Sequence, residues 1–349
     1  MKLLTRINEL AKIGASESGI CRPSGSTEDA KARNWVIQWM MEAGMTVRLD
    51  DHQNVVGRLE GVGKPIVVGS HIDTVLTAGK FDGVLGVLAG IDAAEQLAGK
   101  IKSPLEVVVF NDEEVTMGGS VGYTASQPDI KAFLELHVEQ GPVLDLQKAD
   151  IGVVEGIVGQ RRCEITIFGQ ENHAGTTPMN MRDDALVKAA KVIQYVNELA
   201  SNEGNGLVAT VGKLEVSPNQ FSIVPGQVDF TLQVRDLDAA NMEWFVNKVC
   251  DEFDLNAHIT HKSEPALCST WIQEVIEHVC DSSDLKSIRM PSRASHDAQN
   301  FTFCPMGMIF VPSVDGISHS PKEFTTDEQC YNGSLVLTEV IQKIDDFTG

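Results

Sequence analysis

Two continuous apolar segments, separated by a helix-like segment, place the strongest limit on the fold of this chain. Residues 64–71 (KPIVVGSH) and 105–110 (LEVVVF) have the length and composition of buried strands. Between them, residues 82–97 space their apolar side chains for one face of a helix, and Gly99 can end it. Strands without polar alternation are typical of a parallel sheet that is covered on both faces. We therefore predict an α/β domain that binds ligands at the loops following its strands.

A different pattern begins near residue 157. Its strands alternate polar and apolar side chains, and two amphipathic helices interrupt them. The order is strand, helix, strand, strand, helix, strand, over residues 162–168, 184–199, 207–214, 227–235, 242–253 and 256–261. This is the ferredoxin-like β-α-β-β-α-β order. We expect a main domain of residues 1–156 plus 264–349, interrupted by a smaller domain of residues 157–263.

Charge and cysteine content exclude several classes of partner and site. Lysine plus arginine number 28 and aspartate plus glutamate 49, so the net charge is 28 − 49 = −21. A surface of this sign repels nucleic acid and anionic membranes, and no segment approaches the ~20 apolar residues of a membrane span. The seven cysteines are scattered without a CxxC pair, which argues against a disulfide framework or a cysteine zinc site. We expect a cytoplasmic protein with no nucleic-acid or membrane partner.

Side chains with metal-ligand chemistry gather in short motifs, mostly at loops after apolar strands. They are His71 and Asp73 (GSHIDT), Asp82 (KFDGVLG), Glu113 and Glu114 (NDEE), His137 (ELHVEQGP) and His319 (GISHSP). In GSHIDT either residue can bind a metal, or the carboxylate can hold the histidine from behind. Taken singly, the other motifs also allow ordinary interpretations. Asp82 can cap a helix, the two glutamates can be a solvated charge pair, and His319 can lie on the surface.

Together these motifs favour a centre of two metal ions. Glu113 and Glu114 come soon after an apolar strand, so both carboxylates are expected at its exposed end. Two like charges in one place need a cation or a raised pKa. Mixed nitrogen and oxygen donors suit zinc, manganese, cobalt or nickel better than magnesium or calcium.

The ordered motifs resemble those of a known family. In chain order they are GSHIDTVLTAGKFDG, NDEE, ELHVEQGP, IVGQRR, NHAGTTPM, PNQFSIVPG, HDAQ and GISHSP, and they run through almost the whole chain. The chain resembles the M20 metallopeptidase superfamily, specifically its amidase, hydantoinase and carbamoylase branch. The resemblance implies a zinc-exopeptidase-like α/β catalytic domain with an inserted ferredoxin-like dimerisation domain that acts as a lid.

The resemblance also implies roles for the metal-centre residues. Two divalent ions per subunit, Zn²⁺ or Mn²⁺ with Co²⁺ or Ni²⁺ as alternatives, would be held by His71, Asp82, Glu114, His137 and His319. Asp82 would bridge the two ions. Glu113 would be the general base, and Asp73 would orient His71. Histidine at position 137, where peptidase branches usually have an acidic residue, favours the carbamoylase branch.

Four further residues receive roles from the resemblance. Asn219 and Arg235 would bind the substrate carboxylate, and Gln140 would approach the ureido group. His173 would stabilise the oxyanion from the smaller domain of the partner subunit. The residues alone leave alternatives open, because His173 can be a loop histidine that caps the next helix and Arg235 can be a surface charge.

The implied activity is hydrolysis of a linear ureido C–N bond by a homodimer, through hydroxide that the metals hold. The substrate would be an N-carbamoyl-L-amino acid or an allantoate-like ureido acid. An aminoacylase or dipeptidase that uses the same metals is an alternative. A catalytically weak metabolite-binding homologue is another, because residues 115–136 form a shorter connection than the family usually has. Arg293 stands where the family usually has small residues, so it can obstruct the pocket or add an anion contact.

Overall fold

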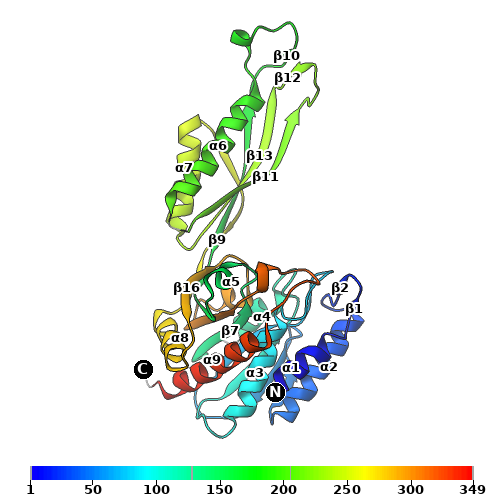
Figure 1. The fold of residues 1–349 in the computed structure, drawn as a ribbon, viewed down its shortest axis with the longest axis vertical. Helices are drawn as coiled ribbons and strands as arrows, with labels where there is room; N and C mark the ends of the chain where they lie inside the picture. Colours follow the sequence, from blue (N-terminus) through cyan, green and yellow to red (C-terminus); the bar gives the residue numbers. More distant parts are fainter. Residues whose placement is uncertain (1, 127–128, 205, 348–349) are drawn as a thin grey trace. The chain divides into compact units, whose positions relative to one another are not determined.

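The computed structural model describes residues 2–126, 129–204 and 206–347, drawn as a ribbon in Figure 1. The chain divides into two compact units, Met1–Ile157 together with Ala266–Gly349, and Val158–Pro265. The sequence predicts domain boundaries after residues 156 and 263. The units of the structure divide after Ile157 and Pro265, so the two sets of boundaries agree within two residues. The larger unit is therefore discontinuous in sequence, and the smaller unit is an insertion into it.

The larger unit is built on a sheet of nine strands within the described residues. Eight follow the order β15 (Ala266–Leu267), β8 (Ile151–Ile157), β17 (Met306–Val311), β7 (Ala132–Val138), β5 (Ile66–His71), β6 (Leu105–Phe110), β4 (Val55–Leu59) and β3 (Thr46–Leu49), and β16 (Ser287–Ser292) pairs with β8. The neighbours β17, β7, β5 and β6 run parallel to one another. These four strands are buried along their whole length, which explains their continuous apolar sequences.

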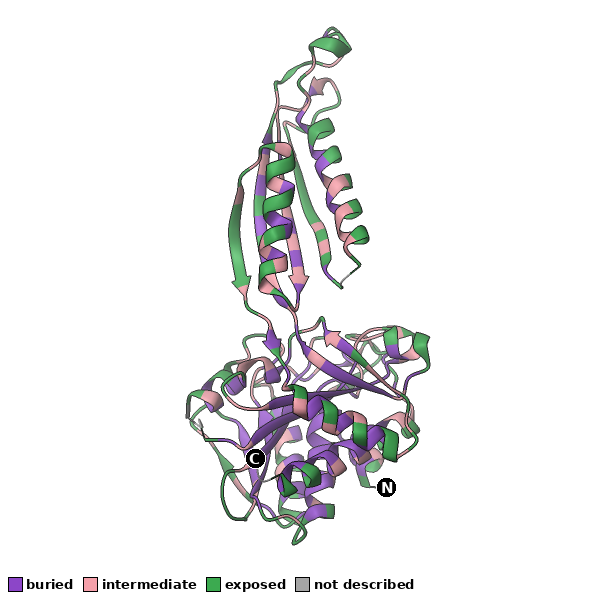
Figure 2. Ribbon diagram, turned by 90° about the vertical axis from the view of Figure 1, so that its left-hand side faces the viewer, coloured by how far each residue is buried: buried purple, intermediate pink, exposed green. Residues whose placement is uncertain are grey.

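Separate apolar cores cover the two faces of this sheet. One core contains side chains of five helices: α1 (Lys2–Leu10), α2 (Thr27–Glu42), α3 (Val84–Leu97), α8 (Thr270–Ser282) and α9 (Asp327–Asp346). The other core gathers the aromatic rings of Phe110, Phe133 and Phe301 with Tyr123 of α4 (Gly118–Ser126). Figure 2 shows the central strands of the sheet coloured as buried. None of the helices in the described part of the chain has the length and apolar character needed to cross a membrane.

Short elements complete the larger unit at the ends of its strands. They are β1 (Ala15–Ser16), β2 (Gly19–Ile20), α5 (Val143–Gln147), η2 (Asp297–Asn300) and η3 (Val314–Gly316). The long helix α9 begins at a capping box, in which the Thr326 side chain accepts from the Gln329 backbone and the Gln329 side chain accepts from the Thr326 backbone. This cap fixes the point where the loop after β17 ends.

The smaller unit is a four-stranded antiparallel sheet with two helices. Its strand order is β11 (Val208–Ser217), β13 (Gln227–Asp236), β9 (Gly159–Phe168) and β14 (Ala257–Ser263). Helices α6 (Ala185–Glu203) and α7 (Ala239–Phe253) pack on the face formed by alternate, buried residues of the strands. At one end of the unit lie β10 (Asn172–His173), β12 (Ile223–Val224) and η1 (Met179–Met181) (Figure 1). The predicted α/β fold with a ferredoxin-like insertion is confirmed.

Candidate metal centre

Four neighbouring parallel strands deliver the predicted ligands to one edge of the large sheet. β5 ends at His71, β7 carries His137 next to its last residue, and β6 leads into the loop with Glu113 and Glu114. The loop after β17 supplies His319. The register of β5 and β6 ends both strands at the same level. Because ligands bind outside the carboxyl ends of strands in α/β sheets, this edge is where a site is expected.

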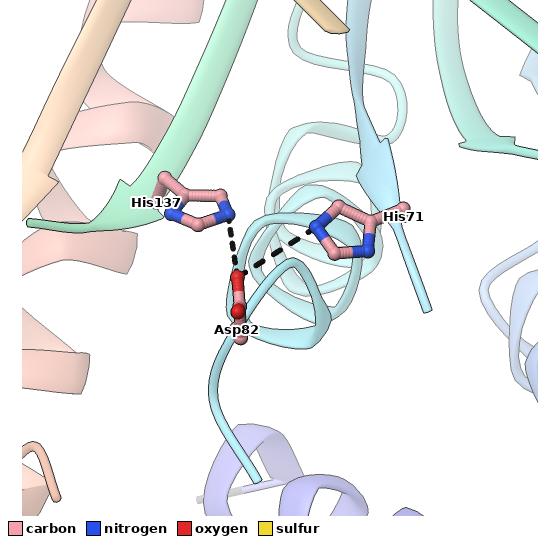
Figure 3. A group of neighbouring side chains, drawn as sticks. All are labelled: His71, Asp82 and His137. Carbon is pink, nitrogen blue, oxygen red and sulfur yellow. Dashed lines mark ion pairs between the residues drawn. The ribbon is translucent and has the colours of Figure 1, made fainter. Parts of the chain in front are cut away.

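The carboxylate of Asp82 lies at the middle of the cluster. It is buried just before α3, whose N-cap is Gly83, so Asp82 does not cap this helix. Its Oδ1 lies 3.2 Å from His137 Nε2 and 3.7 Å from His71 Nε2, and Figure 3 shows both rings turned toward it. Ligand atoms of these three residues lie within 4.8 Å of one another. They form the first group that can hold a metal ion.

A second group shares Asp82 with Glu114 and His319. His319 Nε2 lies 3.2 Å from Asp82 Oδ2 and 3.8 Å from Glu114 Oε2. The two oxygens of the Asp82 carboxylate therefore face different groups. The side chain of His319 is 50% exposed, and its backbone has a left-handed φ of 51°. The centre thus consists of a buried group and a more open group that Asp82 joins.

The hydrogen bonds of His71 and His137 fix the tautomer in which Nε2 carries the free electron pair, and in His137 this atom accepts from the backbone N–H of Gly83 at 3.1 Å. Nδ1 of His71 lies 3.0 Å from the main-chain oxygen of Asp73, and Nδ1 of His137 lies 2.8 Å from that of Val138. A carbonyl oxygen only accepts, so in both neutral rings the proton on Nδ1 is donated. Metal-binding histidines usually donate their second ring N–H to such an acceptor. The donor set therefore fits metal ions in residue type, spacing and tautomer.

Asp73 and Glu113 lie beside the two groups. The Asp73 carboxylate accepts hydrogen bonds from the backbone N–H groups of Glu113, at 3.4 Å, and Glu114, at 3.3 Å. Its Oδ1 is 3.8 Å from His71 Nδ1, so the carboxylate lies behind His71 and also ties the loop after β5 to the loop after β6. Glu113 Oε2 lies 3.6 Å from His71 Nε2. Among the described residues, Glu113 lines the same pocket as the ligands but belongs to neither metal group.

The pKa values of the cluster show how strongly these charges interact. Burial would raise the pKa of Asp82, but the protonated rings of His137 and His319, which donate hydrogen bonds to its carboxylate, hold it well below its usual range. Burial would lower the pKa of His71, but the carboxylates around it, above all Glu113, hold it well above its usual value. Burial raises the pKa of Glu114. The carboxylates thus require nearby positive charge, which divalent cations provide while leaving the imidazole nitrogens as ligands.

The cluster opens into a pocket of about 180 Å³. Besides the ligands and Glu113, its walls contain Met117, Gln140, Ala294, Ser295 and His296. Gln140 Nε2 donates to Asp82 Oδ2 at 3.1 Å, which places this amide directly beside the metal groups. Arg293, which precedes Ala294, is not part of this lining. The pocket therefore has room for the reacting group of a small molecule next to Asp82 and Glu113.

The other predicted residues lie in the smaller unit, toward two different ends of its sheet. His173 is in β10, and Asn219 follows β11 at the end where Ser217 pairs with Gln227. Arg235 lies near the other end of β13. From residue 227 to residue 235 a strand extends about 26 Å, at roughly 3.3 Å per residue. The structure therefore does not bring Asn219 and Arg235 of one chain together.

His173 presents a hydrogen-bond donor at an exposed position. Its Nδ1 accepts from the backbone N–H groups of Gly175, at 2.9 Å, and Thr176, at 3.3 Å. The neutral ring therefore carries its proton on Nε2. The N-cap of α6 is Asp184, whose side chain accepts from the first turn of that helix. The alternative in which His173 caps the next helix is therefore wrong.

Two buried side chains that the motifs did not single out hold the ligand loops. Glu323 accepts hydrogen bonds from the backbone N–H groups of Phe81, at 2.9 Å, and Asp82, at 3.3 Å. Arg22, which is 1% exposed, donates from Nε to the main-chain oxygen of Ile72, at 2.7 Å, in the loop after β5. The one sequence signal for Glu323 is its position in the same short loop as the GISHSP motif.

Comparisons with known proteins identify the family. Residues 67–343 match peptidase family M20/M25/M40. An N-carbamoyl-L-amino acid amidohydrolase of Geobacillus stearothermophilus is 34% identical, with 98% of this chain and 98% of the relative covered. An allantoate amidohydrolase of Escherichia coli (strain K12) is 33% identical, with 96% of this chain and 95% of the relative covered.

Solved structures give the same result. The crystal structure of an amidase of the hydantoinase/carbamoylase family from Burkholderia multivorans is 31% identical and superposes with a TM-score of 0.87. The match covers 98% of this chain and 97% of that one, so it includes both units. The resemblance seen in the motifs is confirmed. The chain belongs to peptidase family M20/M25/M40, in the branch of the hydantoinase/carbamoylase amidases.

Proposed function

We propose that this protein is a dimetal amidohydrolase that cleaves the linear ureido C–N bond of an N-carbamoyl-L-amino acid or an allantoate-like ureido acid. The observation that carries the proposal is the pair of ligand groups that share Asp82, with Glu113 beside them. Relatives named N-carbamoyl-L-amino acid amidohydrolase and allantoate amidohydrolase support a ureido substrate. A carbamoyl substrate would yield ammonia, carbon dioxide and the amino acid.

Five side chains would hold two divalent ions. His71 and His137 would bind one ion, Glu114 and His319 the other, and Asp82 both. Zn²⁺ or Mn²⁺ suits this mixed donor set, with Co²⁺ or Ni²⁺ as alternatives. When bound, the ions would lower the pKa of a water and polarise the carbonyl under attack.

Glu113 is the general base in this proposal. Its carboxylate lies in the pocket beside His71 without belonging to a ligand group, so it can accept the proton of the attacking water and return it to the leaving nitrogen. Asp73 accepts a hydrogen bond from the backbone of Glu113, which fixes the base relative to the loop that carries His71. Gln140, next to Asp82 in the pocket, would contact the ureido group.

The remaining contacts would come from two chains. Asn219 lies at the end of the sheet where β13 begins and Arg235 lies about 26 Å farther along that strand, so a single chain cannot place both on one substrate carboxylate. A homodimer can supply them from different protomers. The exposed Nε2–H of His173 would stabilise the oxyanion in the partner's site. We therefore include a homodimer with shared active sites in the proposed function.

A substrate panel with metal-replete enzyme tests the proposal. N-carbamoyl-L-amino acids, allantoate and β-ureidopropionate are compared with matched N-acetyl amino acids and with dipeptides. We expect ammonia release from a ureido acid with kcat/KM at least about tenfold above that for the matched N-acetyl compound, because a site that hydrogen-bonds N–H groups rejects analogues without them. A preference for N-acetyl compounds or dipeptides would indicate an aminoacylase or dipeptidase instead. No turnover and no tightly bound metal would indicate a metabolite-binding homologue.

Mixing two inactive variants tests the shared active site. His173→Ala and Glu113→Gln homodimers should each be nearly inactive, because one lacks the oxyanion donor and the other the base. In a mixed dimer, one site combines the intact Glu113 of one chain with the intact His173 of the other. If the two chains pair at random, half of the dimers are mixed and each of these has one complete site. Activity should therefore recover to about one quarter of the wild-type value. No recovery in a sample that native mass spectrometry shows to be mixed would exclude His173 acting across the interface.

We also propose a cytoplasmic location and an absence of nucleic-acid and membrane partners. All seven cysteines are free thiols, as expected in a reducing compartment. The net charge of −21 opposes binding to polyanions. Cell fractionation that recovered the protein outside the cytoplasm would contradict the location.

A further inference from the structure

His319 is the ligand whose position depends most on its surroundings. It lies in the loop between β17 and α9, and its side chain is 50% exposed while that of Asp82 is 4% exposed. Its backbone φ of 51° is left-handed. A residue other than glycine keeps this conformation only where the surrounding structure imposes it. Something outside the ligand set must therefore hold this loop.

Glu323 joins this loop to the segment that carries Asp82. Glu323 Oε1 accepts from the backbone N–H groups of Phe81 at 2.9 Å and Asp82 at 3.3 Å, and Oε2 accepts from Ser318 Oγ at 3.2 Å. Gln140 Nε2 lies 3.2 Å from Ser318 Oγ and donates to Asp82 Oδ2 at 3.1 Å. These hydrogen bonds close a ring that begins at the backbone of Asp82 and ends at its carboxylate.

The packing around Glu323 leaves it little freedom. The side chain is buried, and a Cβ atom added at Gly79 would lie 2.4 Å from Glu323 Cβ, which is closer than atoms allow. The backbone N–H of Glu323 donates to the main-chain oxygen of Ser320 at 3.0 Å, which closes the turn that follows His319. Glu323 is thus fixed both by its neighbours and by its own loop.

The buried metal group does not depend on this ring in the same way. His71 and His137 belong to central strands, and each imidazole is held by a main-chain oxygen close to it in sequence. The ring of hydrogen bonds through Glu323 instead reaches Oδ2 of Asp82, the oxygen that faces His319. Any change at Glu323 should therefore act on one metal group more than on the other.

We propose that Glu323 is a positioning residue that holds His319 and Asp82 Oδ2 for the second ion. This inference rests on the two-ion centre of the proposed function. The ion held by Asp82, Glu114 and His319 is then bound more weakly than the other ion and exchanges more readily. The ion held by His71, Asp82 and His137 binds first. Replacing an outer partner of a metal ligand typically lowers metal affinity 10- to 100-fold, which sets the expected effect.

Titration of the metal-free full chain with Co²⁺ tests the proposal. The absorption of the bound ion reports its coordination, and competition with a chelator gives the binding constants. Wild-type protein should show two classes of site. Glu323→Ala should weaken the second class by about 10- to 100-fold and the first class much less. Glu323→Gln keeps an acceptor for the N–H groups of Phe81 and Asp82, so it should restore most of the lost affinity.

Two further variants separate positioning from general stability. Asp345→Ala is the matched control, because the Asp345 carboxylate is also buried and accepts two backbone N–H groups, from Lys102 and Ser103, but contacts no ligand loop. It should leave both Co²⁺ constants unchanged. Ser318→Ala breaks the ring while keeping Glu323 and its bonds to the Asp82 segment. It should weaken the second ion alone, and it keeps the test decisive if Glu323→Ala does not fold.

Three results would overturn the proposal. The first is wild-type Co²⁺ binding constants in both Ser318→Ala and Glu323→Ala. The second is that these variants bind both ions more weakly by the same factor. The third is a single class of Co²⁺ site in the wild-type chain. None of these results depends on a substrate. Failure to hydrolyse any ureido acid, in protein that shows the expected Co²⁺ behaviour, would instead contradict the proposed function and leave the role of Glu323 intact.

Discussion

Glu113→Gln is expected to lower kcat by about 10²- to 10⁴-fold while both metal ions stay bound. Glu113 lies in the pocket, 3.6 Å from His71 Nε2, but belongs to neither ligand group among the described residues. Glutamine has nearly the same shape as glutamate but cannot take a proton from water. The loss should therefore appear in kcat and not in metal content. Kinetics on the best ureido acid, with metal analysis of the same sample, measure both.

Asp112→Asn is the control for this variant. Asp112 is the neighbouring acidic residue, its carboxylate accepts from Thr116 Oγ1, and its left-handed φ of 59° is one that asparagine tolerates. It should keep wild-type activity within a few-fold. A Glu113→Gln enzyme with wild-type kcat would exclude Glu113 as the base. An inactive enzyme that had also lost metal would assign Glu113 to the ligands instead.

Asp82→Asn is expected to remove tight binding of both ions, and with it all measurable hydrolysis. Each oxygen of Asp82 faces a different ligand group, and an amide offers only one oxygen and no charge. A ligand that binds only the folded state adds RT ln(1 + [L]/Kd) to the free energy of unfolding. Wild-type protein should gain about 2.7 kcal/mol from each ion when metal is at 100 times the Kd of that ion, and the variant should gain far less. Denaturant unfolding with and without Zn²⁺ gives this difference.

Asp92→Asn is the matched control for the Asp82 variant. Asp92 lies on α3, the helix that follows Asp82, and its carboxylate accepts hydrogen bonds from Gln96 and Ser334. This variant should show the full stabilisation by Zn²⁺. If Asp82→Asn protein gained as much stability from metal as the wild type does, Asp82 could not be the residue that joins the two groups.

Much of the candidate metal centre could be predicted because of where its residues stand in the sequence. His71 ends a continuous apolar strand, and Glu113 follows another after a short loop. Parallel strands end at one edge of a sheet, so such residues meet there without further information. Asp82 and His319 lie in loops, where periodicity gives no position, and their motifs identified them. The ferredoxin-like insertion was readable because its strands alternate with period two and its helices do not.

Contacts between distant parts of the chain could not be predicted in the same way. Glu323 bonds to the backbone of Asp82, 241 residues earlier, and Arg22 bonds to that of Ile72, 50 residues later. Apolar patterns identify faces of helices and strands but do not identify such partners. The separation of Asn219 from Arg235 depends on strand pairing, which the alternation within β13 alone does not fix. The strands β10 and β12 have two residues each, too few to show any period.

Metal bound around Asp82 should be required for hydrolysis of a ureido C–N bond. The most direct test is ammonia release from an N-carbamoyl-L-amino acid, measured on one preparation after removal of metal and again after reloading with Zn²⁺ or Mn²⁺. We predict no release above background from the stripped protein and full recovery after reloading. Ammonia release that persists without metal would contradict the account. So would reloaded protein that hydrolyses the matched N-acetyl amino acid but leaves the ureido acid intact.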